Sequence, residues 1–169
     1  VVFIGDVMGR GVAAAAAMTE MRAATRAFAS VDPEPASVVT RLDRMALSYG
    51  REQLVTMVYG VADAATGTVT MTNAGHPPPL VLRAGGTVEA LPYADGPPVG
   101  LSDGGRGEVT ATLAVGDSLV LYSDGLIERR GESIDDGLAR LARAPPAIED
   151  PVRDEVGLDA GLLRHRCGA

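Results

Sequence analysis

The chain has 169 residues, of which 46% are hydrophobic, 22% charged and 4% aromatic, and its formal net charge is −7. This length is enough to bury a core without disulfides or structural metals, and the single cysteine, Cys167, excludes a disulfide framework or a multi-cysteine zinc site. The acidic balance argues against a nucleic-acid partner, no apolar run reaches the roughly 20 residues of a membrane-spanning helix, and the cysteine usage makes the cytoplasm the expected compartment.

The first third of the chain predicts one strand and two helices. Residues 1–5 form a short apolar run that ends in the glycine-punctuated turn 5–11. Residues 12–29 then carry apolar side chains at helical spacing, and the prolines at 33 and 35 break the chain before a second helix. The apolar face of that second helix comprises Val38, Val39, Leu42, Met45, Ala46 and Tyr49, and Gly50 closes it.

The rest of the chain predicts mainly strands joined by short turns. We expect strands over residues 54–61, 68–72, 80–83, 87–91, 108–113 and 118–123, and a helix over 134–143. Two consecutive helices followed by hairpins indicate an α+β fold rather than alternating βαβ units. We therefore expect one domain over 1–169, with an irregular C-terminal segment at 144–169.

The first candidate site is the turn 5–11, which contains Asp6. Its glycine spacing also fits a loop that cradles a dinucleotide pyrophosphate. However, Asp6 would place a carboxylate beside the phosphates, and helix continues where that motif needs a second strand. A carboxylate beside permissive glycines instead suits a hard cation such as Mg²⁺ or Mn²⁺. The structural alternative is that Asp6 simply caps the following helix.

The second candidate is Asp124, which follows a strand that is apolar on successive positions, as expected of a strand buried on both faces. A carboxylate at such a strand end must be solvated, hydrogen-bonded or metal-bound. The pair Asp124-Gly125 is also a common turn. Because Asp6 stands in a similar position near a strand end, the two aspartates together favour a shared metal site more than either does alone.

The third candidate is the segment 73–79, in which Gly75 permits unusual backbone angles and three prolines stiffen the chain after His76. A rigidly held, exposed His76 would be suited to acid–base work near neutral pH. The alternative, which we favour, is that His76 has a structural role and hydrogen-bonds the backbone.

Taken together, five motifs resemble one family. They lie in order at residues 2–11, 54–67, 73–80, 95–101 and 121–128, the last reading Leu121-Tyr122-Ser123-Asp124-Gly125-Leu126-Ile127-Glu128. The sequence resembles the SpoIIE/RsbU-type branch of the bacterial metal-dependent protein serine/threonine phosphatases, the PPM superfamily of protein phosphatase type 2C. The resemblance covers residues 1 to about 143.

This resemblance implies a four-layer α-β-β-α sandwich with two ions, Mn²⁺ or Mg²⁺, at one edge of the sheets, where they activate a water without a nucleophilic side chain. By motif match, Asp6 would ligate or bridge both metals, Val7 would supply a backbone carbonyl and Asp124 would bind one metal. The further residues Gly9, Asn73, Gly75, His76 and Gly125 would line the site. The implied substrate is a phosphorylated anti-sigma-factor antagonist. The resemblance is also compatible with a sensory domain upstream and with a homodimer.

Two departures from the family pattern concern the ends of the chain. The family's first strands are expected upstream of residue 1, and the paired-aspartate motif near its end has two candidates, Asp154-Glu155 and the segment 158–163 that contains Asp159. We take Asp154 as the third carboxylate ligand. The alternative function is a catalytically degenerate phosphatase fold that acts as a regulatory binding module, and a dinucleotide-binding oxidoreductase ranks third.

Overall fold

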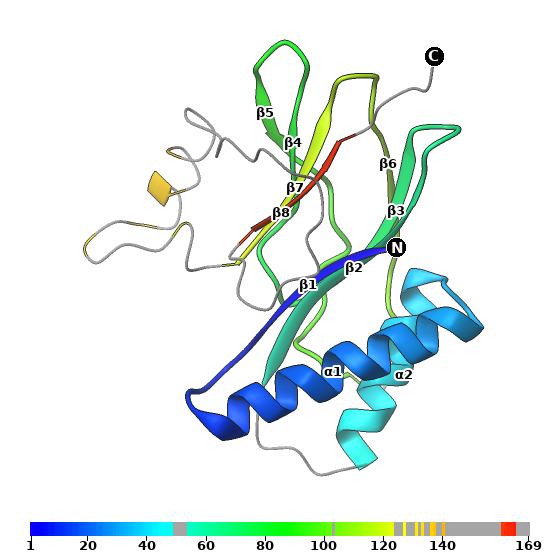
Figure 1. The fold of residues 1–169 in the computed structure, drawn as a ribbon, viewed down its shortest axis with the longest axis vertical. Helices are drawn as coiled ribbons and strands as arrows, with labels where there is room; N and C mark the ends of the chain where they lie inside the picture. The colour runs from blue at the N-terminus through cyan, green and yellow to red at the C-terminus, as the bar shows by residue number, and fades with distance from the viewer. Residues whose placement is uncertain are drawn as a thin grey trace.

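The computed structural model describes residues 1–48, 54–102, 104–123 and 160–164, the last by their backbone, together with residues 127, 131, 133, 136, 137 and 140. Within them lie two four-stranded sheets, ordered β1-β2-β3-β6 and β5-β4-β7-β8, and every strand pair is antiparallel. The two sheets and helices α1 and α2 are shown in Figure 1. This arrangement confirms the predicted α+β class.

The first sheet contains β1 (Val2–Val7), β2 (Val55–Asp63), β3 (Thr68–Ala74) and β6 (Val109–Thr112). Strands β2 and β3 form the predicted hairpin, whose turn is closed by a 2.9 Å hydrogen bond from the Gly67 amide to the Asp63 carbonyl. Strand β1 is longer than predicted, because Asp6 and Val7 pair with Thr56 and Val55 of β2. Asp6 therefore belongs to the strand and not to the turn after it.

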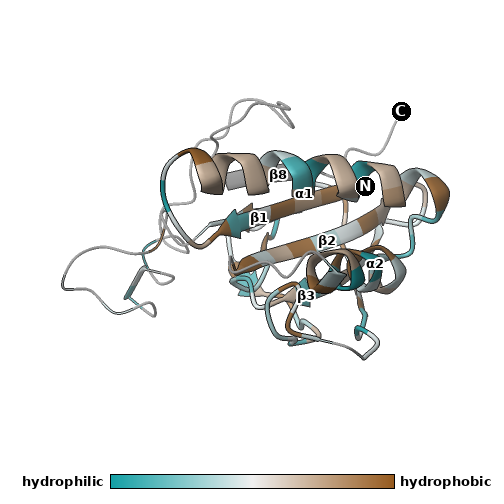
Figure 2. Cartoon of the chain, turned by 90° about the horizontal axis from the view of Figure 1, so that it is seen from below, coloured by the Kyte–Doolittle hydropathy of each residue, from teal (hydrophilic) through white to brown (hydrophobic). Residues whose placement is uncertain are grey.

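Helices α1 (Val12–Val31) and α2 (Pro35–Ser48) follow the predicted positions closely. They lie alongside β1 and β2, where Figure 2 shows hydrophobic segments on both strands. The predicted apolar face of α2 packs there, with Val38, Val39 and Leu42 completely buried, whereas Tyr49 and Gly50 lie outside the described residues. Asp32 links the two helices, because its carboxylate accepts hydrogen bonds from the Ser37 hydroxyl and the Glu34 amide.

The second sheet contains β4 (Leu80–Leu82), β5 (Val88–Ala90), β7 (Ser118–Tyr122) and β8 (Ala160–Arg164). All five residues of β7 are buried, as the apolar run Leu119-Val120-Leu121 within it predicted. Strand β8 lies in the segment expected to be irregular. It forms because it covers the free edge of β7, with Ala160 opposite Tyr122, and unpaired strand edges favour such pairing.

Two cores stabilise these layers. One lies between the helices and the first sheet, and the other lies between the two sheets and includes Val58, Val69, Val81, Leu119 and Leu121. The described residues thus form three layers, α-β-β. The helix predicted over 134–143 falls mostly outside them, although residues 136, 137 and 140 are helical.

Candidate active site

A pocket of about 300 Å³ opens at one end of the sandwich. The pocket is built by the end of β1 with the residue after it and by the beginning of β2. The connection that follows β3 and the connection that follows β5 complete it. Its lining residues are Asp6, Met8, Leu54, Thr56, Gly75, His76, Pro77 and Pro98. These residues come from four of the five motifs that the sequence analysis grouped: 2–11, 54–67, 73–80 and 95–101.

Alternation along β1 directs Asp6 toward this pocket. Successive side chains of a strand point to opposite faces, and Val2 and Ile4 face the core between the sheets. Asp6 continues that row, whereas Val7 is buried against the helices. On β2, Val58 belongs to the same inner face, and Thr56 continues its row. The inner face of the first sheet thus changes from apolar to polar where the pocket begins.

Among the described residues, none donates a hydrogen bond or an ion pair to the Asp6 carboxylate. A capping role is also excluded, because the N-cap of α1 is Gly11 and no side chain caps that helix. A partly buried carboxylate without protein donors needs water or a cation, and carboxylate oxygen is a preferred ligand of Mg²⁺ and Mn²⁺. The donor chemistry of Asp6 therefore fits a divalent ion.

His76 lies at the pocket but is only 5% exposed. Its Nδ1 atom is 2.9 Å from the Thr56 hydroxyl, and its Nε2 atom is 3.0 Å from the Tyr122 carbonyl oxygen. Asn73 holds the same turn: its side-chain oxygen accepts the His76 amide and its side-chain nitrogen donates to the His76 carbonyl, both at 2.8 Å. The structural role favoured for His76 agrees with these contacts.

Pro98 forms part of the pocket wall, and Gly75 lets the chain approach it closely. Gly75 has φ +70°, and a Cβ atom there would lie 2.9 Å from Pro98 Cδ. Glycine is the residue that tolerates both conditions. The wall is anchored from behind by Arg106, whose guanidinium donates to the Pro97 carbonyl at 2.6 Å and forms a buried 2.6 Å ion pair with Asp43 of α2.

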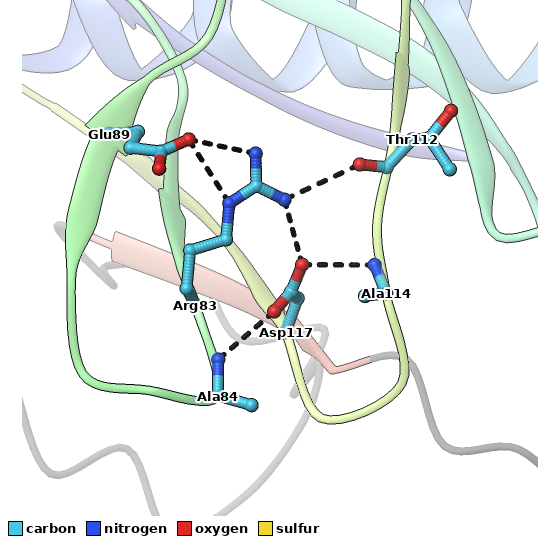
Figure 3. A network of polar contacts seen from close by, with 6 residues as sticks. All are labelled: Arg83, Ala84, Glu89, Thr112, Ala114 and Asp117. Atoms are coloured by element: carbon cyan, nitrogen blue, oxygen red, sulfur yellow. Dashed lines mark hydrogen bonds and ion pairs between the residues drawn. The ribbon is translucent and has the colours of Figure 1, made fainter.

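The other end of the sandwich is closed by a polar network, drawn in Figure 3. Asp117, which is 2% exposed, accepts hydrogen bonds from the Arg83 guanidinium at 2.8 Å and from the backbone amides of Ala84 and Ala114. Arg83 also pairs with Glu89 and donates to the Thr112 carbonyl. The Arg83 hydrogen bond is the main reason that the pKa of Asp117 is lowered. This network joins the second sheet to β6 of the first.

Tyr122, whose carbonyl contacts His76, is the last residue of β7. Burial raises the pKa of its phenol to about 12, and no described residue hydrogen-bonds the buried hydroxyl. Its backbone, rather than this side chain, contacts the site through His76.

The predicted site residues fall into two groups. Asp6, Gly75 and His76 line the pocket, Asn73 lies directly behind it, Val7 is the last residue of β1, and Gly9 belongs to the loop before α1. Asp124, Gly125 and Asp154 lie outside the described residues. No group of three potential metal-binding side chains occurs within the described part of the chain, so the ligand set remains a prediction.

Five lining residues were not among the predicted site residues: Met8, Leu54, Thr56, Pro77 and Pro98. A signal for Thr56 existed, because it is a hydroxyl residue within the otherwise apolar stretch 54–59. Pro98 lies within the motif 95–101, but its place in the pocket depends on the fold of the long connection between β5 and β6.

The fold of the described residues is the one seen in PP2C-type phosphatase domains. A sequence model of the family described as Stage II sporulation protein E (SpoIIE) matches residues 1–159. The chain therefore belongs to the SpoIIE family. The predicted family and fold class are confirmed.

Solved structures support this assignment. The RsbU and RsbW domains of Rv1364c from Mycobacterium tuberculosis match with 33% identity and a TM-score of 0.77, over 83% of this chain and 40% of that one. The PP2C domain of SpoIIE from Bacillus subtilis matches with 19% identity and a TM-score of 0.71, over 88% and 44% of the two chains.

RsbX in complex with magnesium matches with 18% identity and a TM-score of 0.58, over 82% of this chain and 70% of that one. At such identity the likeness shows the fold alone. The chain spans less than half the length of the Rv1364c and SpoIIE structures. Across the described residues, no helix is long and apolar enough to cross a membrane.

Proposed function

We propose that this chain hydrolyses phosphoserine or phosphothreonine in a protein substrate. The observation that carries the proposal is the Asp6 carboxylate, which lines the pocket and receives no hydrogen bond from a described residue. Membership of a phosphatase family supports the reaction class. The proposed location is the cytoplasm, as the single cysteine suggests.

The proposed ligands of two divalent ions, Mn²⁺ or Mg²⁺, are Asp6, the Val7 carbonyl, Asp124 and an aspartate near the end of the chain. When bound, such a pair supplies positive charge to the phosphoryl oxygens and lowers the pKa of a bound water. The related fold of RsbX holds magnesium, which supports this cofactor class. The chain's own contribution is the Asp6 carboxylate at the polar end of β1 and a pocket wall that includes Pro98.

The position of β8 bears on the last ligand. The family pattern places that aspartate just before a final apolar strand, and in this chain the residue immediately before β8 is Asp159. This favours the alignment through Asp159 over the one through Asp154. Mn²⁺ titration of Asp159→Asn beside Asp154→Asn tests the choice: the ligand variant should weaken binding, and its counterpart should bind as the wild type does.

The proposed substrate is a phosphorylated anti-sigma-factor antagonist in a partner-switching system. The Rv1364c relative, which contains both an RsbU and an RsbW domain, supports a regulatory context of this kind. The test is hydrolysis of a phosphoserine protein by the purified chain with and without Mn²⁺, beside Asp124→Asn. Metal-independent hydrolysis that Asp124→Asn does not slow would refute the mechanism. Partner binding without metal binding would instead favour the regulatory module.

A further inference from the structure

We propose that His76 is a positioning residue that sets the spacing between the two strand ends on which the metal ligands depend. The inference rests on the proposed function, because it gives a role to a residue beside the proposed metal site. Its basis is the pair of hydrogen bonds that the buried imidazole makes to different sheets, one to Thr56 of β2 and one to Tyr122 of β7.

The partners show which ring nitrogen must carry a hydrogen. A carbonyl oxygen accepts hydrogen bonds and cannot donate them, so the contact with the Tyr122 carbonyl places a hydrogen on Nε2. In the neutral ring, Nδ1 is then the acceptor and the Thr56 hydroxyl is the donor. The structure therefore assigns the Nε2–H tautomer, and both ring nitrogens serve to connect the sheets.

Each partner of the ring leads directly to a proposed ligand. Thr56 stands opposite Asp6 in the β1–β2 ladder and shares its inner face. Tyr122 is the last residue of β7, and Asp124 follows it by two positions in the sequence. The imidazole consequently joins the strand that carries one aspartate to the strand that leads to the other.

The ring is itself held rigidly. Asn73 makes reciprocal hydrogen bonds to the amide and carbonyl of His76, and Gly75 is fixed against Pro98 in a left-handed conformation. Proline follows at position 77 and restricts the backbone further. A ring held in this way can transmit a defined distance between the sheets. Groups behind metal ligands typically change metal affinity by about 10–100-fold when removed.

The test compares His76→Ala, which loses both contacts, with His76→Gln, whose amide can still donate and accept. Calorimetric titration of the purified chain with Mn²⁺ should give a Kd about 10–100-fold weaker for His76→Ala. His76→Gln should recover most of that loss. Thr56→Val should weaken Mn²⁺ binding less than His76→Ala, since it removes one contact, and Thr56→Ser, which keeps the hydroxyl, should weaken it less than Thr56→Val.

Asp117→Asn is the matched control for a purely structural effect, because it removes a buried hydrogen-bond acceptor at the far end of the sandwich. It should lower the unfolding temperature without changing the Kd for Mn²⁺. If His76→Ala behaves in the same way, with unchanged Mn²⁺ affinity at a reduced unfolding temperature, the positioning role is wrong.

Two measurements without metal separate this inference from the proposed function. Nitrogen NMR of the imidazole should show the Nε2–H tautomer, and amide hydrogen exchange at residues 122–124 should accelerate in His76→Ala more than in Asp117→Asn. If the wild-type chain neither binds Mn²⁺ nor hydrolyses phosphoserine, the proposed function fails and these two results decide the bridging role. The opposite tautomer, or unchanged exchange at residues 122–124, overturns it.

Discussion

Asp6 and Asp117 stand at opposite ends of the same sandwich, and their surroundings differ in every respect that matters to a carboxylate. Asp117 receives hydrogen bonds from Arg83 and from two backbone amides. Asp6 lines a pocket and receives none from any residue that the structure describes. A carboxylate with protein donors stabilises the fold, whereas one without them is available to bind a ligand.

The comparison also shows how one fold separates stability from function. At the Asp117 end, the network links the β4–β5 hairpin to β6 and to the turn before β7 (Figure 3). At the Asp6 end, the support lies behind the pocket and comes from the hydrogen bonds of His76 and Asn73 and from the Asp43–Arg106 ion pair. At this end of the sandwich, the polar contacts therefore hold the pocket lining in place and leave the Asp6 carboxylate accessible from the pocket.

The largest expected effect comes from replacing each of the two aspartates separately with asparagine. Asp6→Asn should lower Mn²⁺-dependent phosphatase activity by about 1,000-fold, since a loss of several kcal/mol of charge stabilisation has that effect on a rate. Its unfolding free energy without metal should stay within about 0.5 kcal/mol of the wild type. Asp117→Asn should lower the unfolding free energy and leave the Mn²⁺-dependent activity of the folded protein unchanged. The reason is that its amide nitrogen would face hydrogen-bond donors. Equal losses of activity in both variants would contradict the division.

A second prediction concerns the buried ion pair behind the pocket. Asp43→Asn leaves the Arg106 charge, 2% exposed, without its partner, and should lower the unfolding free energy by about 3–5 kcal/mol. The double variant Asp43→Leu with Arg106→Met should recover part of that loss, because it removes both charges. Urea denaturation of the three variants measures these values. A loss below about 1 kcal/mol in Asp43→Asn would show that the pair does not anchor the wall.

A third prediction compares glycines of similar backbone conformation at the two ends. A Cβ atom added at Gly75 (φ +70°) would lie 2.9 Å from Pro98, whereas one added at Gly86 (φ +88°) would have nothing within 4 Å. Gly86→Ala should therefore cost only the backbone strain, about 1–2 kcal/mol. Gly75→Ala should cost about 1–3 kcal/mol more through overpacking. It should also weaken Mn²⁺ binding, which Gly86→Ala leaves unchanged; similar Mn²⁺ titrations for both variants would contradict this.

The smallest expected effect is a dependence of stability on pH at the Asp117 end. The hydrogen bond from Arg83 lowers the pKa of Asp117 below its unfolded value, which is about 3.9. The stabilisation is therefore complete above that pH and is lost as the pH falls through the lower folded-state pKa. The difference in unfolding free energy between wild type and Asp117→Asn should shrink from pH 6 to pH 2. A constant difference would mean that the Arg83 contact contributes no such dependence.

Local pattern predicted much of this molecule. The helical spacing of apolar residues located α1 and α2 within about two residues, and the apolar run Leu119-Val120-Leu121 predicted the buried strand β7. These predictions succeeded because they depend on contacts within one element and on burial of its apolar face. The end of β1 was predicted too early, since the pairing of Asp6 and Val7 with β2 depends on residues some 50 positions away.

The sequence by itself determined the order of the elements, their apolar faces, the family and the carboxylate with the chemistry to hold a cation. Only the tertiary structure decided which face Asp6 occupies, that Thr56 stands beside it, and that His76 spans the two sheets. The same holds for Arg83 and Asp117, which are 34 positions apart. Such contacts follow from strand register and sheet packing, and a shift of one residue in register turns every side chain to the other face.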